Sequence, residues 1–273
     1  MAKLYLGTRE ISPVVLSHGV PRVIDSGVYK IPSVTSYSLP SGVTSLGSFA
    51  LAYAFRGNTT LTSVDLSTLT TLPNASSLYY AFYGCTGITG SIDLSHLTSI
   101  GASSTLSYTF YGCTGITGAD FSSLTTATGT SCMAQIFRGC TNFATISFPS
   151  LTRIGTNSSS GNYGHFSYAF YGTKIEELRF PELTAIYSTG GSTASYGTFA
   201  YNNKLKKIYF PKVTTINYGS GASSANRASI SNMFSNCTAL TEIHFAEANQ
   251  TAIEASPGYS TAWASSATIY FDL

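Results

Sequence analysis

Charged residues are scarce in this sequence: Asp, Glu, Lys and Arg together make up 10% of 273 residues, and the formal net charge is +2. Ordinary soluble proteins contain about 25% charged residues. No run of Lys and Arg is longer than the pair Lys206-Lys207, so the basic patch that nucleic acids and anionic membranes attract is missing. We therefore expect no nucleic-acid partner, and a surface that is polar mainly through hydroxyl and amide groups.

Long apolar runs are absent as well. The first ten residues, Met1–Glu10, contain no apolar stretch of the roughly 7–15 residues that a secretion signal needs. No segment approaches the about 18 consecutive apolar residues that cross a membrane. We therefore expect no membrane insertion, and assembly in a cytoplasm rather than export by the general secretory route.

The motifs of common enzyme classes are also missing. The sequence contains no nucleophile elbow, zinc-protease motif, phosphate-binding loop or dinucleotide fingerprint. Its four histidines lie in four different contexts, none within a nucleophile-elbow pattern: His18, His96, His165 and His244. We predict a non-catalytic protein.

The five cysteines form no Cys-x-x-Cys pair, and an odd count argues against a disulfide framework. Four of them follow the same local pattern, Gly-Cys-Thr or Asn-Cys-Thr, at Cys85, Cys113, Cys140 and Cys237. We expect these four to be small buried hydrophobic residues that pack against their copies. Cys132 lies outside the pattern, and we expect it to be an exposed thiol.

What the sequence does contain is an internal repeat. Phenylalanine recurs in a fixed context, with spacings of 27, 28, 27, 33, 29 and 35 residues, at Phe55, Phe82, Phe110, Phe137, Phe170, Phe199 and Phe234. About nine residues after each Phe come two apolar residues separated by one position, as in Val64 and Leu66. A unit this short cannot bury its apolar side alone, so neighbouring units must stack. The pattern predicts a solenoid of about seven units.

Length variation falls in one phase of the repeat, before the next Phe, at residues 158–164 and 219–225. Insertions confined to one phase project from one side of a solenoid, where binding loops commonly lie. We expect loops on that side.

The stretch Tyr80–Gly90, nearly repeated at Tyr108–Gly118, closely resembles the BspA-like leucine-rich repeats of bacterial, phage and protist surface proteins. The resemblance implies a right-handed, gently curved stack, with a sheet of short parallel strands on one face and turns and short helices on the other. It covers residues 35–245. Residues 1–34 are expected to form a strand-rich N-terminal cap or docking segment. Residues 246–273 are expected to form a C-terminal cap, with a short helical stretch and a closing strand.

The residue between the two apolar positions of each strand should point away from the core, because side chains alternate along a strand. These residues are Asp65, Asp93, Asp120, Ser147, Arg179, Tyr209 and His244. The three aspartates have two interpretations. They accept hydrogen bonds from the following serines or neighbouring turns, or they form a weak calcium site between adjacent units. No other cofactor is expected.

Tyrosine is conspicuous, with 19 copies, many of them beside the repeat Phe. Tyrosine among Ser, Gly and Asn is typical of binding surfaces, because it offers a large contact area with few rotamers and a polar tip. The alternative is an aromatic ladder that packs unit against unit, and both can hold. The candidate ligand-binding residues are Tyr80, Tyr83, Tyr108, Tyr111, Tyr168, Tyr171 and Tyr209.

These features favour a recognition module that binds a cell-surface glycan or protein. The two ends of the chain resemble those of repeat proteins encoded among phage and prophage tail genes of Firmicutes. That resemblance implies a tail-associated adhesin or receptor-binding protein located in the virion, with the N-terminal segment contacting other virion or assembly proteins. The alternatives are a BspA-like adhesin on a bacterial cell surface, and a purely structural or decoration protein of a larger assembly.

Overall fold

In the computed structural model, the residues described in full are 34–156, 164–187, 198–217, 233–256, 259 and 267–273. Before them, the backbone of four short strands is described. These strands form two antiparallel pairs, β1 (Leu4–Leu6) with β2 (Arg9–Ile11) and β3 (Val15–Ser17) with β4 (Val20–Arg22). The N-terminal segment therefore contains strands, as its sequence suggested.

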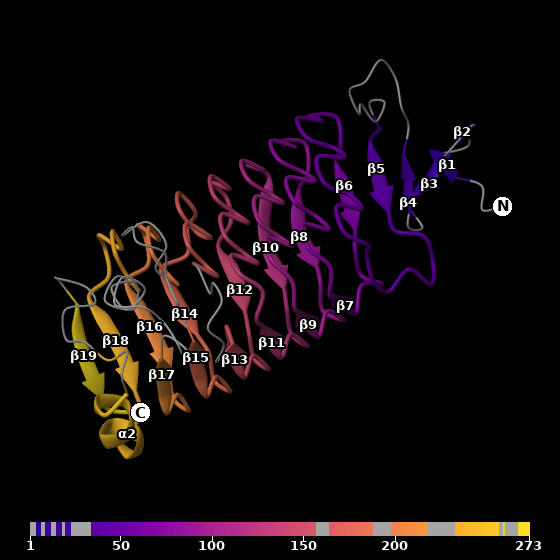
Figure 1. Ribbon diagram of the computed structural model, residues 1–273. Coiled ribbons are helices and arrows are strands. Elements are labelled where there is room, and N and C mark those ends of the chain that lie inside the picture. Colours follow the sequence, from indigo (N-terminus) through magenta and orange to yellow (C-terminus); the bar gives the residue numbers. More distant parts are fainter. Residues whose placement is uncertain are drawn as a thin grey trace.

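The rest of the chain is a β-solenoid of about seven turns, drawn in Figure 1 as an elongated stack that runs from β5 to β19. Every strand pair in the stack is parallel. Two rows of short strands run along it. The first row consists of β5 (Ser36–Ser38), β6 (Ser63–Asp65), β8 (Gly90–Asp93), β10 (Ile116–Asp120), β12 (Thr145–Ser147), β14 (Glu177–Arg179), β16 (Lys207–Phe210), β18 (Glu242–Phe245) and β19 (Thr268–Phe271).

The second row is a continuous six-stranded sheet that starts with the two-residue strand β7. Its members pair apolar residue on apolar residue, for example Leu72 with Ile100 and Ile154 with Ile186, and all of these side chains are buried. The strands are β7 (Thr71–Leu72), β9 (Ser99–Ile100), β11 (Thr126–Ala127), β13 (Arg153–Ile154), β15 (Ala185–Tyr187) and β17 (Thr215–Asn217).

The third side of the solenoid is built from turns, which we call the turn face. Its described segments are 49–57, 76–84, 104–112, 131–139, 164–172, 198–201 and 233–236. Short helices were expected here, and this expectation was wrong for the described residues: the helices they contain, η2 (Glu247–Asn249) and α2 (Gln250–Glu254), follow the last unit. The short helical stretch predicted near the C-terminus is therefore present.

Hydrogen bonds explain why the turn face is not helical. Alternate amides donate to the next unit, as in Tyr53 N to Tyr79 O (2.9 Å), and the amides between them close turns within the unit, as in Ala54 N to Leu51 O (3.0 Å). Every fourth residue then takes a left-handed conformation, including Tyr80 at φ 56° and Gly84 at φ 68°. Such a conformation costs a non-glycine residue about 1–2 kcal/mol, which the bonds between units must offset.

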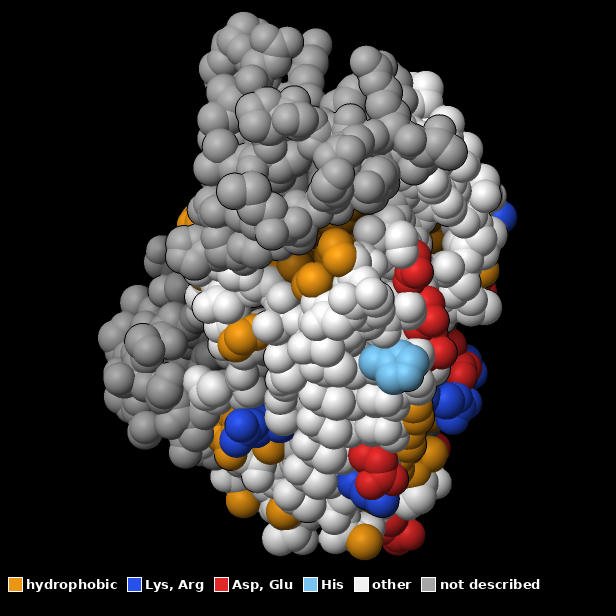
Figure 2. All heavy atoms as spheres, turned by 90° about the vertical axis from the view of Figure 1, so that its right-hand side faces the viewer, with side chains coloured by type: hydrophobic (Ala, Val, Ile, Leu, Met, Phe, Trp, Pro, Cys, Tyr) orange, Lys and Arg blue, Asp and Glu red, His pale blue; other side chains and the backbone are white. Residues whose placement is uncertain are grey.

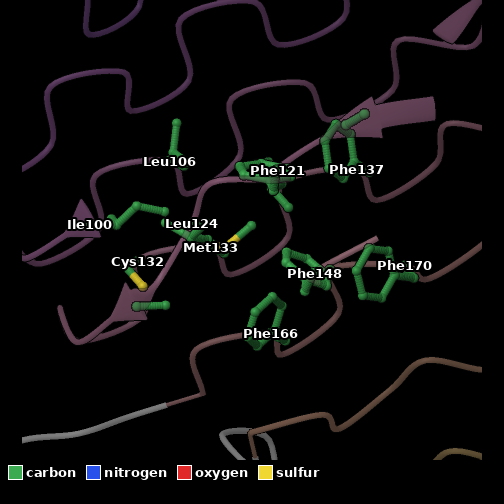
Figure 3. Packing of buried hydrophobic residues seen from close by; sticks show 14 of the residues in the cluster. Ile100, Leu106, Phe121, Leu124, Cys132, Met133, Phe137, Phe148, Phe166 and Phe170 are labelled. Atoms are coloured by element: carbon green, nitrogen blue, oxygen red, sulfur yellow. The ribbon is translucent and has the colours of Figure 1, made fainter. Parts of the chain in front are cut away.

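The core is a set of side-chain columns that run the length of the stack. Phe55, Phe82, Phe110 and Phe137 form a stack of rings with centroids 5.2, 5.3 and 5.8 Å apart. The cysteine column is buried as predicted, and each Sγ lies 3.0–3.1 Å from a Phe carbonyl oxygen of the preceding unit. Cys132 is also fully buried, so its prediction as an exposed thiol was wrong. It lies inside the core with Leu106 and Met133 (Figure 3).

The expected phenylalanine column changes register in the second half of the stack. Phe199 does not continue from Phe170 but stacks on Phe166, at 5.6 Å and an interplanar angle of 12°. The unit that contains Phe199 is one turn shorter: Tyr201 precedes Ile208 by seven residues, whereas Tyr108 precedes Ala119 by eleven. The Phe170 amide then lacks the usual carbonyl partner, and the Asn202 Oδ1 accepts its hydrogen bond instead, at 2.8 Å.

Candidate functional site

A column of tyrosines lines the turn face, and we call it the tyrosine ladder: Tyr53, Tyr80, Tyr108, Tyr168 and Tyr201, with Gln135 in the fourth place. All six residues are in the left-handed region. Successive rings are nearly parallel. The centroids of Tyr53 and Tyr80 lie 5.2 Å apart, those of Tyr80 and Tyr108 4.3 Å apart, and those of Tyr168 and Tyr201 4.0 Å apart. The fixed backbone therefore determines where each ring stands.

Three residues further along each turn, a flanking column runs beside the ladder: Arg56, Tyr83, Tyr111, Arg138 and Tyr171. Tyr83 and Tyr111 stack at 4.6 Å. The Arg56 guanidinium lies within 5.1–5.9 Å of the centroids of three tyrosines, so cation–π attraction ties the two columns together. The stacked rings confirm the ladder interpretation. The rings are also half-buried, and Tyr171 is 37% exposed, so ligand binding by them stays a prediction.

The ladder presents uncharged phenol groups. Burial and the neighbouring Tyr108 raise the pKa of Tyr80 well above its usual value. Burial and the hydrogen bond with Tyr201 raise the pKa of Tyr168 to about 12. These hydroxyls therefore stay protonated at physiological pH and can both donate and accept hydrogen bonds.

Where Gln135 replaces tyrosine, the turn face contains a groove of about 330 Å³. Its lining includes the small residues Ser107, Ala134 and Ser167, which we call its floor, and Tyr79. Gln135 Nε2 donates to the Tyr108 hydroxyl at 2.5 Å. Arg138 Nη1 donates to Gln135 Oε1 at 2.9 Å, and its guanidinium lies 4.7 Å from the Tyr168 ring centroid. The break in the ladder thus combines aromatic, hydroxyl and cationic groups.

On the strand face, the three predicted aspartates are exposed and lie in one column. Asp65 Oδ1 accepts from the Ser67 amide at 3.0 Å, and its Oδ2 accepts from Ser38 at 2.9 Å. The Ser67 hydroxyl also donates to Oδ1, at 2.6 Å, and this hydrogen bond, followed by those from the Ser67 amide and Ser38, lowers the pKa of Asp65. Asp93 and Asp120 accept in the same way from the amides two residues later. Figure 2, which views the N-terminal end of the stack, shows acidic side chains in a row on one side of a largely uncharged surface.

The hydrogen bonds that the first interpretation of the aspartates predicts are therefore present. Among the residues that the structure describes, no group of three His, Cys, Asp or Glu side chains is arranged to hold a metal ion. The calcium site stays a prediction, and the geometry adds no ligand to it.

Further along the same column, aromatic and cationic groups replace the aspartates. The Arg179 guanidinium lies 3.8 Å from the Tyr209 ring centroid, and Tyr209 stacks on His244 at 4.6 Å. Tyr270 covers the other face of His244 at 4.8 Å. His244 was expected to point outward into solvent, but it is only 8% exposed, because two rings enclose it and Asp272 and Glu242 bond its nitrogens.

The structure thus brings together six of the seven candidate tyrosines on the turn face and places Tyr209 on the strand face. Tyr79, Gln135 and Arg138 were not identified from the sequence. The signal was present: when the repeats are aligned, Gln135 and Arg138 stand where two preceding units have tyrosine.

The expected loops at 158–164 and 219–225 lie outside the described residues, apart from Gly164. No helix in the described part of the chain is long and apolar enough to cross a membrane.

A comparison with protein families agrees with the repeat architecture. The BspA type leucine rich repeat region matches the chain in six copies, over residues 22–164, 107–231 and 166–262. A leucine-rich repeat protein from Bacteroides ovatus is 20% identical over 78% of this chain and 55% of its own, with a TM-score of 0.31. A leucine rich cell surface protein from Faecalibacterium prausnitzii is 13% identical over 95% of both chains, with a TM-score of 0.28. No curated protein matches the chain.

Proposed function

We propose, from the premise that this chain belongs to the BspA type leucine-rich repeat family, that it is a non-catalytic recognition module whose turn face binds a glycan or protein on a cell surface. The observation that carries the proposal is the tyrosine ladder. Its residues adopt left-handed conformations that cost free energy, and backbone strain of this kind concentrates where side chains must be held for binding.

The geometry of the ladder indicates how it binds. Where rings stack at 4.0–5.2 Å, neighbouring rings cover each other's faces. The ladder and its flanking column therefore offer ring edges and phenol hydroxyls, repeated at about the 4.8 Å spacing of parallel strands. A row of regularly spaced hydroxyls suits a ligand that itself repeats, such as a polysaccharide or an extended peptide backbone.

The setting that we propose is an outer surface, because repeats of the BspA type occur in bacterial, phage and protist surface proteins. The ends of the chain favour a phage or prophage tail, with the N-terminal segment attached to other tail proteins. The alternative is the surface of the bacterium that encodes the protein. Antibody labelling of purified tail particles and of intact cells separates the two settings, and tail or holin genes beside the coding sequence would favour the first.

The proposal is tested by binding of the whole chain to an array of bacterial cell-wall polymers and glycans. The test variant is Tyr83→Phe with Tyr111→Phe, which keeps the stacked rings and removes two hydroxyls. The loss of two hydrogen bonds at about 1 kcal/mol each predicts roughly 10- to 30-fold weaker binding. The control variant is Asp93→Ala with Asp120→Ala on the strand face, measured with and without a chelator.

Unchanged binding by the control variant, together with weakened binding by the tyrosine variant, supports recognition by the turn face. Binding lost in the aspartate variant or on addition of chelator would move the site to the strand face. Absence of wild-type binding to every array component would contradict recognition and favour a structural role in an assembly.

A further inference from the structure

Between the two ends of the ladder, the break at Gln135 is where tyrosine faces are not covered by other rings of the column. Tyr108 stacks on Tyr80 on one side and has Gln135 on the other. Tyr168 stacks on Tyr201 on one side, and its other side meets the Arg138 guanidinium. The two tyrosines stand two units apart, which is about 10 Å at the usual spacing of parallel strands.

The floor of the groove results from the repeat register. In each unit, the residue before the ladder position accepts a hydrogen bond from the ladder residue of the preceding unit: Ser107 from Tyr80, Ala134 from Tyr108 and Ser167 from Gln135. The equivalent residue two units earlier than Ala134 is Tyr79, whose ring stands edge-on to Tyr108 at 5.9 Å. The groove is therefore lined by residues of four successive units, from Tyr79 to Tyr168.

The charge of the groove is positive. Arg138 is its cationic side chain, and no Asp or Glu lines it. Among the described residues no carboxylate forms an ion pair with Arg138, whereas Arg179, Lys206, Lys207 and Lys212 are each paired with a glutamate. Arg138 uses one amino group on Gln135, and a guanidinium has five donors in all. The remaining donors match the planar, two-oxygen geometry of a carboxylate.

We propose that this groove binds a carboxylate-bearing sugar of a surface glycan, which rests on the proposed recognition function and specifies its ligand. The carboxylate pairs with Arg138. The apolar face of the pyranose packs against the Tyr108 ring where it lines the groove, because tyrosine combines an apolar face with a polar tip. The ring hydroxyls reach Gln135 and the serine-lined floor. The groove volume of about 330 Å³ is at the lower end of small-ligand pockets, which fits one or two sugar units.

The test uses oligosaccharide pairs that differ in one group. Glycans ending in D-glucuronic acid or in sialic acid are compared with parents that end in a neutral sugar, and a glycerol-phosphate polymer is included as a phosphate-bearing anion. Wild-type protein is expected to bind an acidic member at least about tenfold more tightly than its neutral parent, the factor expected for a charge-assisted hydrogen-bonded pair.

Two variants separate the groove from the rest of the ladder. Arg138→Gln should abolish the preference for the acidic sugar. Arg56→Gln is the matched control, since Arg56 also lies over three tyrosines but does not line the groove, and it should keep the preference. Gln135→Tyr restores the column residue of the other units and should close the gap, so that the acidic sugar no longer binds while circular dichroism stays unchanged.

Equal binding of acidic and neutral sugars, an unchanged preference in Arg138→Gln, or tighter binding of the phosphate polymer would each overturn the assignment. If binding to other array components remains sensitive to Tyr83→Phe with Tyr111→Phe, only this assignment fails and recognition stands. If the wild-type chain binds nothing, both fail together.

Discussion

The first four units of the solenoid and the units after them share one backbone plan but differ in what joins neighbours. In the first part the phenylalanines recur every 27 or 28 residues and stack ring on ring from Phe55 to Phe137. In the second part the spacing rises to 29–35 residues, and charged pairs between units appear, such as Lys206 with Glu176 and Lys212 with Glu182.

The difference shows how a repeat array tolerates a change of unit length. When adjacent units are equally long, every second amide on the turn face meets a carbonyl of the next unit, and few specific side chains are needed. Where the segment between the turn face and the next strand is shorter, as in the unit of Phe199, amides of the preceding unit lose their carbonyl partners. Asn202 and Asn203 then supply side-chain oxygens to the amides of Phe170 and Gly172, because a buried amide without a partner is costly.

The largest effect is expected from breaking the regular part. Phe110→Ala removes a fully buried ring from between Phe82 and Phe137, which should cost about 3–5 kcal/mol of unfolding free energy. Denaturant unfolding measures it, with Tyr111→Ala on the adjacent, half-buried position as the control. A cost below about 1 kcal/mol would mean that the ring stack is not what stabilises the first units.

The next effect belongs to the irregular part and depends on pH. His165 is fully buried, and neither ring nitrogen has a hydrogen-bond partner among the described residues. Burial lowers the pKa of His165 from 6.5 to about 4. As pH falls from 6.5 to 4 the unfolded chain takes up a proton that the folded chain excludes, so the folded state should lose about 3 kcal/mol in this window.

The matched variant is His165→Thr, since threonine occupies the equivalent positions Thr105 and Thr198. Carboxylates titrate alike in both proteins, so the difference between their unfolding free energies isolates the histidine. That difference should shift in favour of the variant between pH 7 and pH 4. A constant difference would show that His165 takes up its proton as readily in the folded chain as in the unfolded one, and would contradict the lowered pKa.

Asn202 is expected to matter less than these two residues but more than any surface pair. Its side chain accepts from the Phe170 amide at 2.8 Å and donates to the Phe199 carbonyl at 2.8 Å. Asn202→Ala leaves both groups buried and should cost about 1–3 kcal/mol. The control is Asn142→Ala, because Asn142 also bonds a carbonyl of the preceding unit but is exposed. Equal melting temperatures for the two variants would contradict the role given to Asn202.

The same residues show where prediction from sequence succeeded and failed. The solenoid, its parallel strands and the buried cysteine column followed from a period that is easy to see while units are equally long. Phe199 was assigned to the wrong column because sequence spacing cannot show which neighbour accepts each amide. Cys132 was misjudged because it lies outside the repeated Gly-Cys-Thr pattern, although its position faces the core.

The candidate site was predicted in part for a related reason. Tyrosines that recur at one position reveal a ladder, so six of the seven candidates were found on one face. The groove arises because Gln135 replaces the tyrosine found at this position in the neighbouring units. A search for recurring residues does not detect such a replacement. Tyr209 was separated from the others because its strand places it on a different side of the stack, where Arg179 and His244 cover its ring.

The smallest effect is expected from the charged pairs of the irregular part. Lys212 Nζ lies 2.7 Å from Glu182 Oε1 of the preceding unit, but the two side chains are 54% and 46% exposed. Solvent weakens such pairs, so Lys212→Met should cost only about 0.5 kcal/mol, and added salt should remove most of the difference. If thermal unfolding showed a loss of unfolding free energy above about 2 kcal/mol that did not depend on salt, charge pairing would be the main interaction that stabilises the longer units. In that case the asparagine side chains would be secondary, and Asn202→Ala should then cost less than the charge variant does.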